Sequence, residues 1–430
     1  MASSQITNPY QQTSTRFYTL GILTLVYSFN FIDRQLLAIL QEPIKNDLLL
    51  SDTELGLLTG FAFALFYVVA GLPIARLADH NNRRTIISWS LAIWSFMTAI
   101  SGMAQNYLQL FLARVGVGIG EAGCSPPAHS MISDIFPPEQ RASGLSIYSL
   151  GINIGILFGF LLGGWLNQYF GWRVAFMVVG VPGIILAVIV RYTVSEPIRG
   201  FSENRQVSDE KVPFKQVLQL LWSKKSFRYL SLAGGLSAFA GYGMTNWLAS
   251  FIIRTYGMST GEVGSWLALS VGIMGGAGTF ASGYIADKLA RKDKRWYMWL
   301  PAIASVTMIP FFIYAMFAEN VYVHLLVNMI PILMSNVFLS VCIAVTHSLV
   351  GFRMRAFSSA IFFLVINVFG LGMGPVFIGY LSDLLSATLA VDSLRYSMVI
   401  LISVAALLAA VFYFKASHFL RDDLATEPEV

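Results

Sequence analysis

Long apolar stretches alternate with short polar ones along the whole chain. An α-helix needs about 20 predominantly apolar residues to cross the hydrocarbon core of a bilayer, and twelve stretches approach or exceed that length. The pattern therefore predicts an all-α membrane protein with twelve transmembrane helices. The predicted spans, numbered one to twelve in chain order, cover residues 17–40, 54–75, 85–104, 107–132, 142–169, 172–194, 229–254, 261–286, 296–318, 321–350, 356–381 and 394–416.

Composition supports lipid as the surrounding solvent. Of the 430 residues, 56% are hydrophobic and 12% are charged, whereas soluble domains carry about 25% charged residues. The net charge of +5 comes from basic residues in short loops, where topology and lipid headgroups explain them, so we expect no nucleic-acid partner. Cys124 and Cys342 both lie inside apolar stretches. We therefore predict no disulfide framework, no metal site and no cofactor.

A polar stretch divides the twelve spans into two groups of six. We predict an N-terminal six-helix bundle at 1–194 and a cytoplasmic linker at 195–228. A C-terminal six-helix bundle with a short cytoplasmic tail follows at 229–430. Part of the linker forms either a surface helix or a disordered loop, and the sequence leaves both alternatives open.

Loop charges predict the orientation. If both termini are cytoplasmic, most Lys and Arg residues fall on the cytoplasmic side, as the positive-inside rule requires. The basic residues left outside are Lys45, Arg173, Arg254 and Arg395. We therefore expect both termini in the cytoplasm, and the short loops are compatible with a bacterial inner membrane.

The two halves share a loop signature. After span two, Asp79 stands four and five residues before a basic pair, and Asp287 does the same after span eight. The basic residues are Arg83 and Arg84 in the first copy, and Arg291 and Lys292 in the second. The simplest explanation is two pseudo-symmetric six-helix repeats, as in many secondary transporters.

Span five carries Gly151, Gly155, Gly159 and Gly163 at intervals of four residues. A row of glycines on one helix face lets a neighbouring backbone approach closely. We expect that neighbour to be span eight, across the two halves.

The loop signature resembles that of the major facilitator superfamily, Gly-x-x-x-Asp-(Arg/Lys)-x-Gly-(Arg/Lys)-(Arg/Lys). The second copy fits apart from Ala290, and the first departs at Ala75, His80 and Asn82. The resemblance implies a cytoplasmic charge clasp that favours the outward-open state. Its members here are Asp79, Arg83, Arg84, Asp287 and Arg291. The alternative is that the basic residues only anchor the membrane edge.

A narrower resemblance is to the spinster-type lipid transporters. It rests on Asp33-Arg34 in span one, on Gly120-Glu121 and Ser-Pro-Pro at 125–127 in span four, and on Phe-Pro-Pro-Glu-Gln-Arg at 136–141. The organic anion:cation symporters of the same superfamily share the Asp-Arg pair and a Gly-x-x-Glu-Ala, but the proline-containing stretches favour the spinster family. The resemblance implies a transporter that works by alternating access, and not an enzyme.

Four ionisable residues lie deep within spans one and four: Asp33, Arg34, Arg114 and Glu121. Each costs roughly 2.5–3.5 kcal/mol near the bilayer centre, so they should face water and one another. Asp33 and Arg114 lie at a similar depth, so we expect that pair, and Arg34 extends its long stem towards Glu121. The alternatives are a contact between Arg34 and Asp33 through solvent, and a static network that only fixes packing.

These charges suggest separate roles. The planar fork of Arg34 suits a phosphate or carboxylate headgroup, and we place Glu121 with it in the substrate site. Proton coupling is assigned to Glu121, Asp33 and Arg114. Several second-half spans lack charged residues, so that wall is neutral, and its substrate-binding candidates are Tyr242, Asn246 and Asn336. Ordinary helix packing is the alternative for each of these three.

A charged wall and a neutral wall suit an amphiphile. We predict a proton-coupled secondary active transporter that moves an anionic amphiphile such as a lysolipid or sphingolipid phosphate. Its expected partners are that substrate, protons and membrane lipids, and we expect a monomer. The alternative is a symporter of small organic anions such as sugar acids or sugar phosphates. A lipid-modifying enzyme would need a catalytic constellation, such as paired His and Asp near the interface, that this sequence does not contain.

Overall fold

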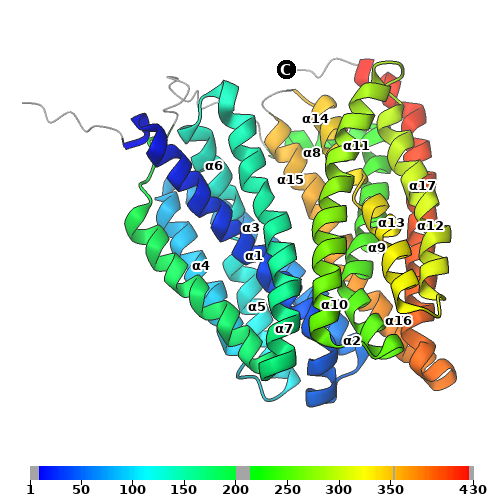
Figure 1. Ribbon diagram of the computed structural model, residues 1–430. Coiled ribbons are helices and arrows are strands. Elements are labelled where there is room, and N and C mark those ends of the chain that lie inside the picture. The colour runs from blue at the N-terminus through cyan, green and yellow to red at the C-terminus, as the bar shows by residue number, and fades with distance from the viewer. Residues whose placement is uncertain (1–8, 200–213, 352–353, 426–430) are drawn as a thin grey trace, which may run out of the picture. The chain divides into compact units, whose positions relative to one another are not determined.

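The computed structural model describes residues 9–199, 214–351 and 354–425, and every regular element within these ranges is a helix (Figure 1). The first half contains η1 (Pro9–Gln11), α1 (Thr13–Leu48), α2 (Asp52–Gly56), η2 (Leu57–Phe61), α3 (Ala62–His80), α4 (Arg83–Ser101), α5 (Tyr107–Glu121), α6 (Ser125–Ile135) and α7 (Pro138–Thr193). The second half contains α8 (Phe214–Ser223), α9 (Lys225–Tyr256), α10 (Thr260–Leu267), η4 (Ala268–Met274), α11 (Gly275–Ala290), α12 (Trp296–Met316), α13 (Val321–Ser335), α14 (Phe338–Ser348), α15 (Arg355–Val365), η6 (Ile366–Met373), α16 (Gly374–Leu389), η7 (Ala390–Asp392) and α17 (Ser393–Ala425).

These elements form the predicted twelve spans, and the all-α, twelve-helix fold is confirmed for the described residues. Seven helical stretches are long and apolar enough to cross a membrane, and two of them are 55 and 69 residues long. Each of these two holds two spans. Within α7 the division falls at Gly171, whose φ of 83° lies in the left-handed region that glycine adopts without steric cost.

The two halves repeat their irregularities as well as their helices. Spans two and eight each contain a π-helical turn, at η2 and η4. Spans four and ten are each divided into two helices, after Glu121 and after Ser335. Shared irregularities at corresponding positions are expected of duplicated repeats.

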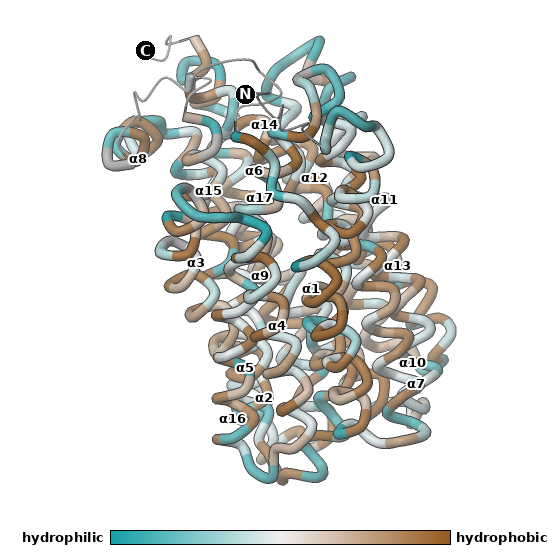
Figure 2. Tube along the Cα trace, turned by 90° about the vertical axis from the view of Figure 1, so that its left-hand side faces the viewer, coloured by the Kyte–Doolittle hydropathy of each residue, from teal (hydrophilic) through white to brown (hydrophobic). Residues whose placement is uncertain are grey.

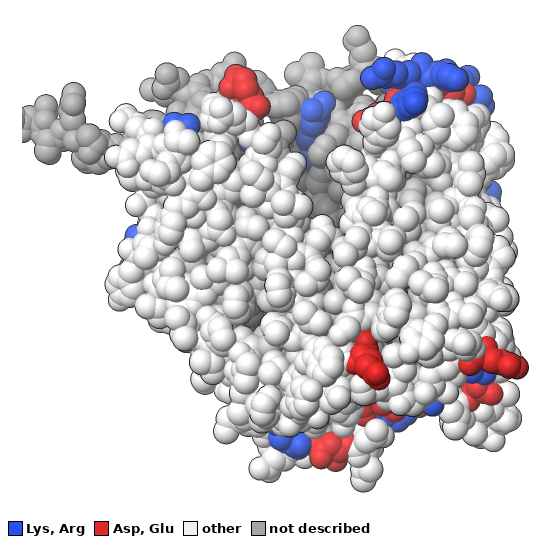
Figure 3. Space-filling model, in the orientation of Figure 1, with Lys and Arg blue, Asp and Glu red and all other residues white. Residues whose placement is uncertain are grey.

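Hydrophilic residues gather in the loops at the helix ends (Figure 2). On the face seen in Figure 3, most charged side chains lie near the two ends of the helices and leave a wide uncharged band between them. Large apolar side chains are exposed on many helices, for example Phe280 at 82% and Trp89 at 65%. Exposed apolar surface on this scale requires a lipid surrounding.

The contacts divide the chain into two compact units. Unit 1 comprises Met1–Leu37 and Leu65–Glu210, and unit 2 comprises Ala38–Ala64 and Lys211–Val430. The segment Ala38–Ala64 therefore groups with the second half of the chain, although it belongs by sequence to the first six spans.

In unit 1 the glycines of α7 pack against two different helices. A Cβ on Gly180 would come within 2.6 Å of the Ala99 backbone nitrogen in α4. On Gly151 and Gly155 it would come within 2.7 and 2.5 Å of carbonyl oxygens of α1. Our prediction that the glycine row packs against span eight was wrong, because the close neighbour is span one. A helix face lined with glycines can accept any neighbouring backbone, so the four-residue spacing of the glycines could not identify which helix packs there.

In unit 2, α9 and α17 pack along each other, and α12 and α16 pack against α17. The indole of Trp247 donates from Nε1 to the Pro375 carbonyl oxygen at 2.9 Å, which ties α9 to α16. The end of the predicted linker forms α8, and its Val217 and Leu221 are buried in the core cluster of this unit. Residues 200–213 of the linker lie outside the described part of the chain.

Candidate functional site

A buried ion pair joins α1 to the end of α5 in unit 1. Arg34 donates from Nε to Glu121 Oε2 at 2.9 Å, and the Glu121 side chain is completely buried while 15% of the Arg34 side chain is exposed. Gly120 lies against the backbone of Trp94 in α4, which leaves no room for a side chain and holds this end of α5 close to its neighbour. The predicted pairing of Arg34 with Glu121 is confirmed.

A second pair lies one residue earlier on α1. Arg114 donates from Nη1 to Asp33 Oδ1 at 3.1 Å, and both side chains are 2% exposed. The predicted pairing of Asp33 with Arg114 is therefore also confirmed. Consecutive residues of one helix project about 100° apart, so Asp33 and Arg34 each meet a different residue of α5.

Each carboxylate keeps one buried oxygen without a hydrogen-bond partner. Among the described residues, neither Glu121 Oε1 nor Asp33 Oδ2 has a donor. Asn30 Oδ1, about one helical turn before Asp33 on α1, is in the same condition. A buried acceptor without a donor costs about 1–3 kcal/mol, and such an oxygen is a ready place for a proton or a substrate hydroxyl.

Two aromatic rings flank Arg34 and were not among the predicted site residues. Its guanidinium carbon lies 5.0 Å from the ring centroid of Phe31 and 5.3 Å from that of Tyr67. Arginine stacks favourably on aromatic faces. Tyr67 comes from α3, and nothing in the sequence distinguishes it from other aromatic residues in apolar spans.

The three predicted second-half residues lie in unit 2. Asn246 is buried and donates from Nδ2 to the Tyr242 carbonyl oxygen at 2.9 Å, so these two residues are adjacent on α9. Asn336 follows α13 directly and donates to the Ile332 carbonyl oxygen at 2.8 Å. Both amides thus bond to carbonyls one turn earlier, which leaves their side-chain oxygens as the groups able to accept from a ligand.

The first copy of the loop signature centres on Arg83, whose side chain is 1% exposed. Arg83 donates from Nε to Glu196 Oε1 at 2.8 Å, and from Nη1 to Asp134. The Glu196 carboxylate also accepts from the backbone nitrogen of Arg84 at 2.9 Å. The sequence indicated Arg83 and Arg84 but not these acidic partners, although Asp134 stands two residues before the Phe-Pro-Pro-Glu-Gln-Arg stretch at 136–141. Asp79 lies in α3, and its side chain lies outside what the structure describes.

The second copy is more open to solvent. Asp287 is exposed on α11 and accepts from the Tyr297 hydroxyl at 2.8 Å. Arg291 is exposed and directly follows α11. The structure thus buries Arg83 of the first copy in unit 1 and exposes Asp287 and Arg291 of the second copy in unit 2.

Comparisons with known proteins agree with this architecture. A model of the Major Facilitator Superfamily matches residues 23–323. An MFS-type efflux pump of Mycolicibacterium smegmatis is 34% identical over 410 residues, which cover 95% of this chain and 94% of that protein. A probable galactarate/D-glucarate transporter of Bacillus subtilis is 28% identical over 318 residues, which cover 68% and 69%. A solved bacterial homologue of the human lysosomal transporter Spinster, in an inward-facing and unoccupied conformation, matches with a TM-score of 0.90 and 33% identity over 96% of this chain and 99% of that chain.

Proposed function

The chain belongs to the major facilitator superfamily, and from this premise we propose that it is a proton-coupled transporter of anionic amphiphiles such as a lysolipid or sphingolipid phosphate. As a member of that family it is a multi-pass integral membrane transporter and not an enzyme. The proposal adds the substrate class, the proton and the residues that handle them.

The observation that carries the proposal is the ion pair of Arg34 and Glu121. Arg34 is the partly exposed member, so an incoming phosphate or carboxylate reaches its guanidinium first. Two parallel N–H bonds from one guanidinium match the two oxygens of such a group. When the substrate occupies Arg34, Glu121 loses its cationic partner.

A proton then replaces that partner. A completely buried carboxylate without a cation is costly to keep ionised, so Glu121 takes up one proton as the substrate takes Arg34. When the substrate leaves, Arg34 returns to Oε2 and the proton departs. The exchange conserves the charge of the pocket, which couples substrate and proton movement within unit 1.

The pair of Asp33 and Arg114 supports this exchange. It is less exposed than the first pair. We assign Asp33 as a second proton carrier, and Arg114 as the cation that pairs with it when the proton has left. Tyr242, Asn246 and Asn336 supply neutral contacts to the substrate, and the apolar spans of unit 2 accept its tail.

The relatives favour two substrate classes. The likeness to the Spinster homologue strengthens the resemblance to the spinster-type lipid transporters, and so supports a lipid-like substrate. The likeness to a sugar-acid transporter supports the second candidate, a symporter of small organic anions. The lack of charged residues in several second-half spans favours the amphiphile, because an apolar wall can accept a hydrocarbon tail but offers little to a polar sugar acid.

The remaining assignments follow from charge and sequence. We propose that both termini are cytoplasmic, that the protein is a monomer of the bacterial inner membrane, and that its bundles are 1–194 and 229–430 with a linker at 195–228. We also propose that the signature residues form a cytoplasmic clasp, in which Arg83 is held by Asp134 and Glu196.

An uptake panel tests the proposal. Purified protein in proteoliposomes is given a labelled lysophospholipid or labelled galactarate, with and without a pH gradient. Transport of the lysophospholipid that responds to the gradient is expected. Transport of galactarate alone would establish the second candidate, and transport of either substrate without any response to the gradient would contradict proton coupling.

A further inference from the structure

Glu121, the proposed proton carrier, is closed off from water. Its side chain is completely buried, and its Oε1 is a buried oxygen without a donor. Its partner Arg34 is 15% exposed, but a guanidinium stays protonated in proteins and cannot pass a proton on. A proton that moves between water and Glu121 therefore needs other groups to carry it.

Two polar residues follow Glu121 at intervals of four, Ser125 and His129. Residues four apart on a helix lie on the same side, with about 5–6 Å between their Cβ atoms. The turn between α5 and α6 keeps a helical course, because the Cys124 backbone nitrogen donates to the Glu121 carbonyl oxygen at 3.1 Å. Ser125 is half-buried and His129 is exposed, so the series extends from the buried carboxylate towards water.

Tyr148 of α7 brings a spare hydroxyl to this series. Its side chain is completely buried, and its hydroxyl oxygen is buried without a hydrogen-bond partner. Ser125 and Cys124 both lie close to it. A buried hydroxyl without a partner costs about 1–3 kcal/mol, and packing alone does not explain it, because phenylalanine would fill the same space. Such a hydroxyl can accept one proton and donate another.

Aromatic contacts hold the Tyr148 ring between α1 and α6. It stacks on the ring of Tyr27 with 4.4 Å between centroids and 6° between planes. On its other neighbour, His129, it makes an edge-on contact at 5.2 Å. The imidazole of His129 is the one group of this set whose ordinary titration falls between pH 5 and 8, and its exposure lets it exchange protons with water.

Charged groups of α4 and α7 also reach α6, closer to its end. There Arg83 binds Asp134, and Arg141 donates to the Ser133 carbonyl oxygen at 3.1 Å. No charged residue that the structure describes acts on His129 itself. Its proton is therefore not fixed in an ion pair.

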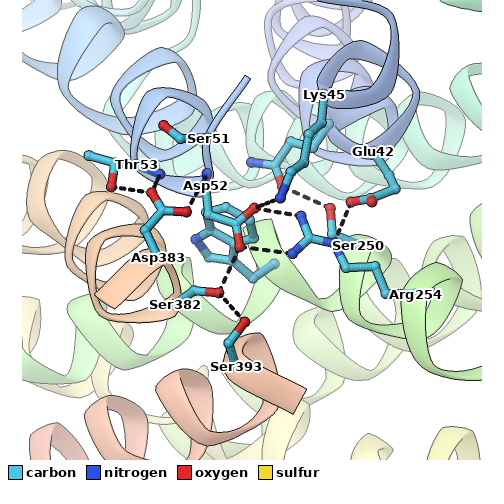
Figure 4. A network of polar contacts seen from close by, with 12 residues as sticks. Glu42, Lys45, Ser51, Asp52, Thr53, Ser250, Arg254, Ser382, Asp383 and Ser393 are labelled. Carbon is cyan, nitrogen blue, oxygen red and sulfur yellow. Dashed lines mark hydrogen bonds and ion pairs between the residues drawn. The ribbon is translucent and has the colours of Figure 1, made fainter. Parts of the chain in front are cut away.

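The polar network of unit 2 shows the opposite condition (Figure 4). There Arg254 donates to the two oxygens of Asp52 at 2.8 and 2.7 Å. Asp383 accepts from the backbone nitrogens of Asp52 and Thr53 at 3.0 and 2.7 Å. Among the labelled residues, all of which the structure describes, no buried side-chain atom lacks a hydrogen-bond partner. A saturated network of this kind fixes a shape, whereas the spare polar atoms of unit 1 are able to move a proton.

We propose that three side chains, Ser125, Tyr148 and His129, form a proton relay between water and Glu121. The inference deepens the proposed function and rests on Glu121 as the proton carrier. A protonated His129 gives its proton to the Tyr148 hydroxyl oxygen, and Tyr148 passes its own proton to the Ser125 hydroxyl. Ser125 in turn passes its proton to Glu121 Oε1. His129 ends one proton poorer and Glu121 one proton richer, and a water molecule bridges any step that is too long for a direct bond.

A pH jump measures the relay without any substrate. Purified protein in detergent is acidified rapidly, while infrared absorption follows the carboxyl band of protonated Glu121, identified by its loss in Glu121→Gln. His129→Ala should slow the rise of this band roughly 100-fold, the lower end of what a positioned proton-transfer group contributes, and added imidazole should restore the rate. Tyr148→Phe should also slow the rise, although it keeps the ring stack and removes only a hydroxyl without a partner.

His418 of α17 provides a matched control. It is also exposed and meets an aromatic ring edge-on, that of Phe414 at 4.9 Å, so His418→Ala should leave the rate unchanged. A native rate in His129→Ala or in Tyr148→Phe would overturn the relay alone. A slow rate in His129→Ala that imidazole does not restore would also overturn it, because disturbed packing gives that result. If no carboxyl band depends on Glu121, the proton carrier of the proposed function and the relay fall together.

In proteoliposomes the relay should affect the speed of transport and not its end point. The accumulation ratio at equilibrium depends on the number of coupled protons, so His129→Ala should reach the native ratio at a lower kcat and an unchanged KM. A changed ratio would overturn the relay, because it would make His129 a proton carrier itself. The pH jump needs no substrate, so a wrong substrate class would leave its result intact.

Discussion

Replacing Glu121 by glutamine is the sharpest test of the proton site. The glutamine keeps the shape of the side chain and an oxygen that accepts from Arg34, but it cannot bind and release a proton. Because Glu121 has one oxygen bonded to Arg34 and one without a donor, we assign it one proton per cycle. One coupled proton changes the accumulation ratio tenfold per pH unit, or ~1.4 kcal/mol, and the Glu121→Gln variant should show no such dependence.

The cost in stability should be modest. Removing one charge of a buried pair costs roughly 3–5 kcal/mol when the other charge is left without compensation. Here Arg34 is 15% exposed and lies beside two aromatic rings, so water and the retained acceptor compensate in part. We expect a loss of about 1–3 kcal/mol, which a thermal unfolding measurement in detergent will show, and a variant that still inserts and folds.

The assay is substrate accumulation in proteoliposomes with the membrane potential clamped to zero by valinomycin and equal potassium, at several imposed pH gradients. The slope of the logarithm of the accumulation ratio against ΔpH is compared for the native chain, for Glu121→Gln and for a control, Glu139→Gln. The Glu139 side chain is exposed in the first turn of α7. A tenfold dependence that survives in Glu121→Gln refutes the assignment. A hundredfold dependence in the native chain that falls to tenfold shows that a second group, with Asp33 the first choice, carries another proton.

Three further substitutions, two of them with a matched control, test the remaining arguments. Arg34→Lys keeps the charge but loses the planar fork, so affinity for a phosphate-bearing substrate should fall roughly 10–100-fold, as two charged hydrogen bonds become one; unchanged binding in a titration would contradict the headgroup role. Gly155→Ala places a methyl group 2.5 Å from α1 and should lower the thermal unfolding temperature. Its control is Gly21→Ala, where the methyl group meets nothing within 4 Å. The control should not lower the unfolding temperature, because alanine favours the helix over glycine by up to ~1 kcal/mol. Arg83→Ala leaves two acidic partners uncompensated and should destabilise the protein by about 3–5 kcal/mol. Arg84→Ala should destabilise it much less, because the shortest contact of Arg84 is through its backbone nitrogen. Equal losses of unfolding temperature in the two variants would refute the central position of Arg83.

The sequence determined the spans and the charged pairs of unit 1. Bilayer thickness fixes how many apolar residues a span needs, so the count of twelve followed from length and hydropathy. Burial cost then required Asp33, Arg34, Arg114 and Glu121 to find partners. The fixed rise of a helix placed Asp33 level with Arg114, and the long arginine side chain closed the distance from Arg34 to Glu121.

Only the tertiary structure decided which surfaces meet. The glycine row of α7 indicated a close neighbour, but a face without side chains carries no information about which helix fills it. Arg83 was expected in a clasp, yet its partners Asp134 and Glu196 lie 51 and 113 residues away in sequence. Asp383 and Arg254 gave no local sign of a role in the sequence, because each bonds to a residue at the start of α2 that lies more than 200 positions away. Periodicity and burial cost act within one helix, whereas these contacts depend on how helices pack, and packing is decided by the whole chain.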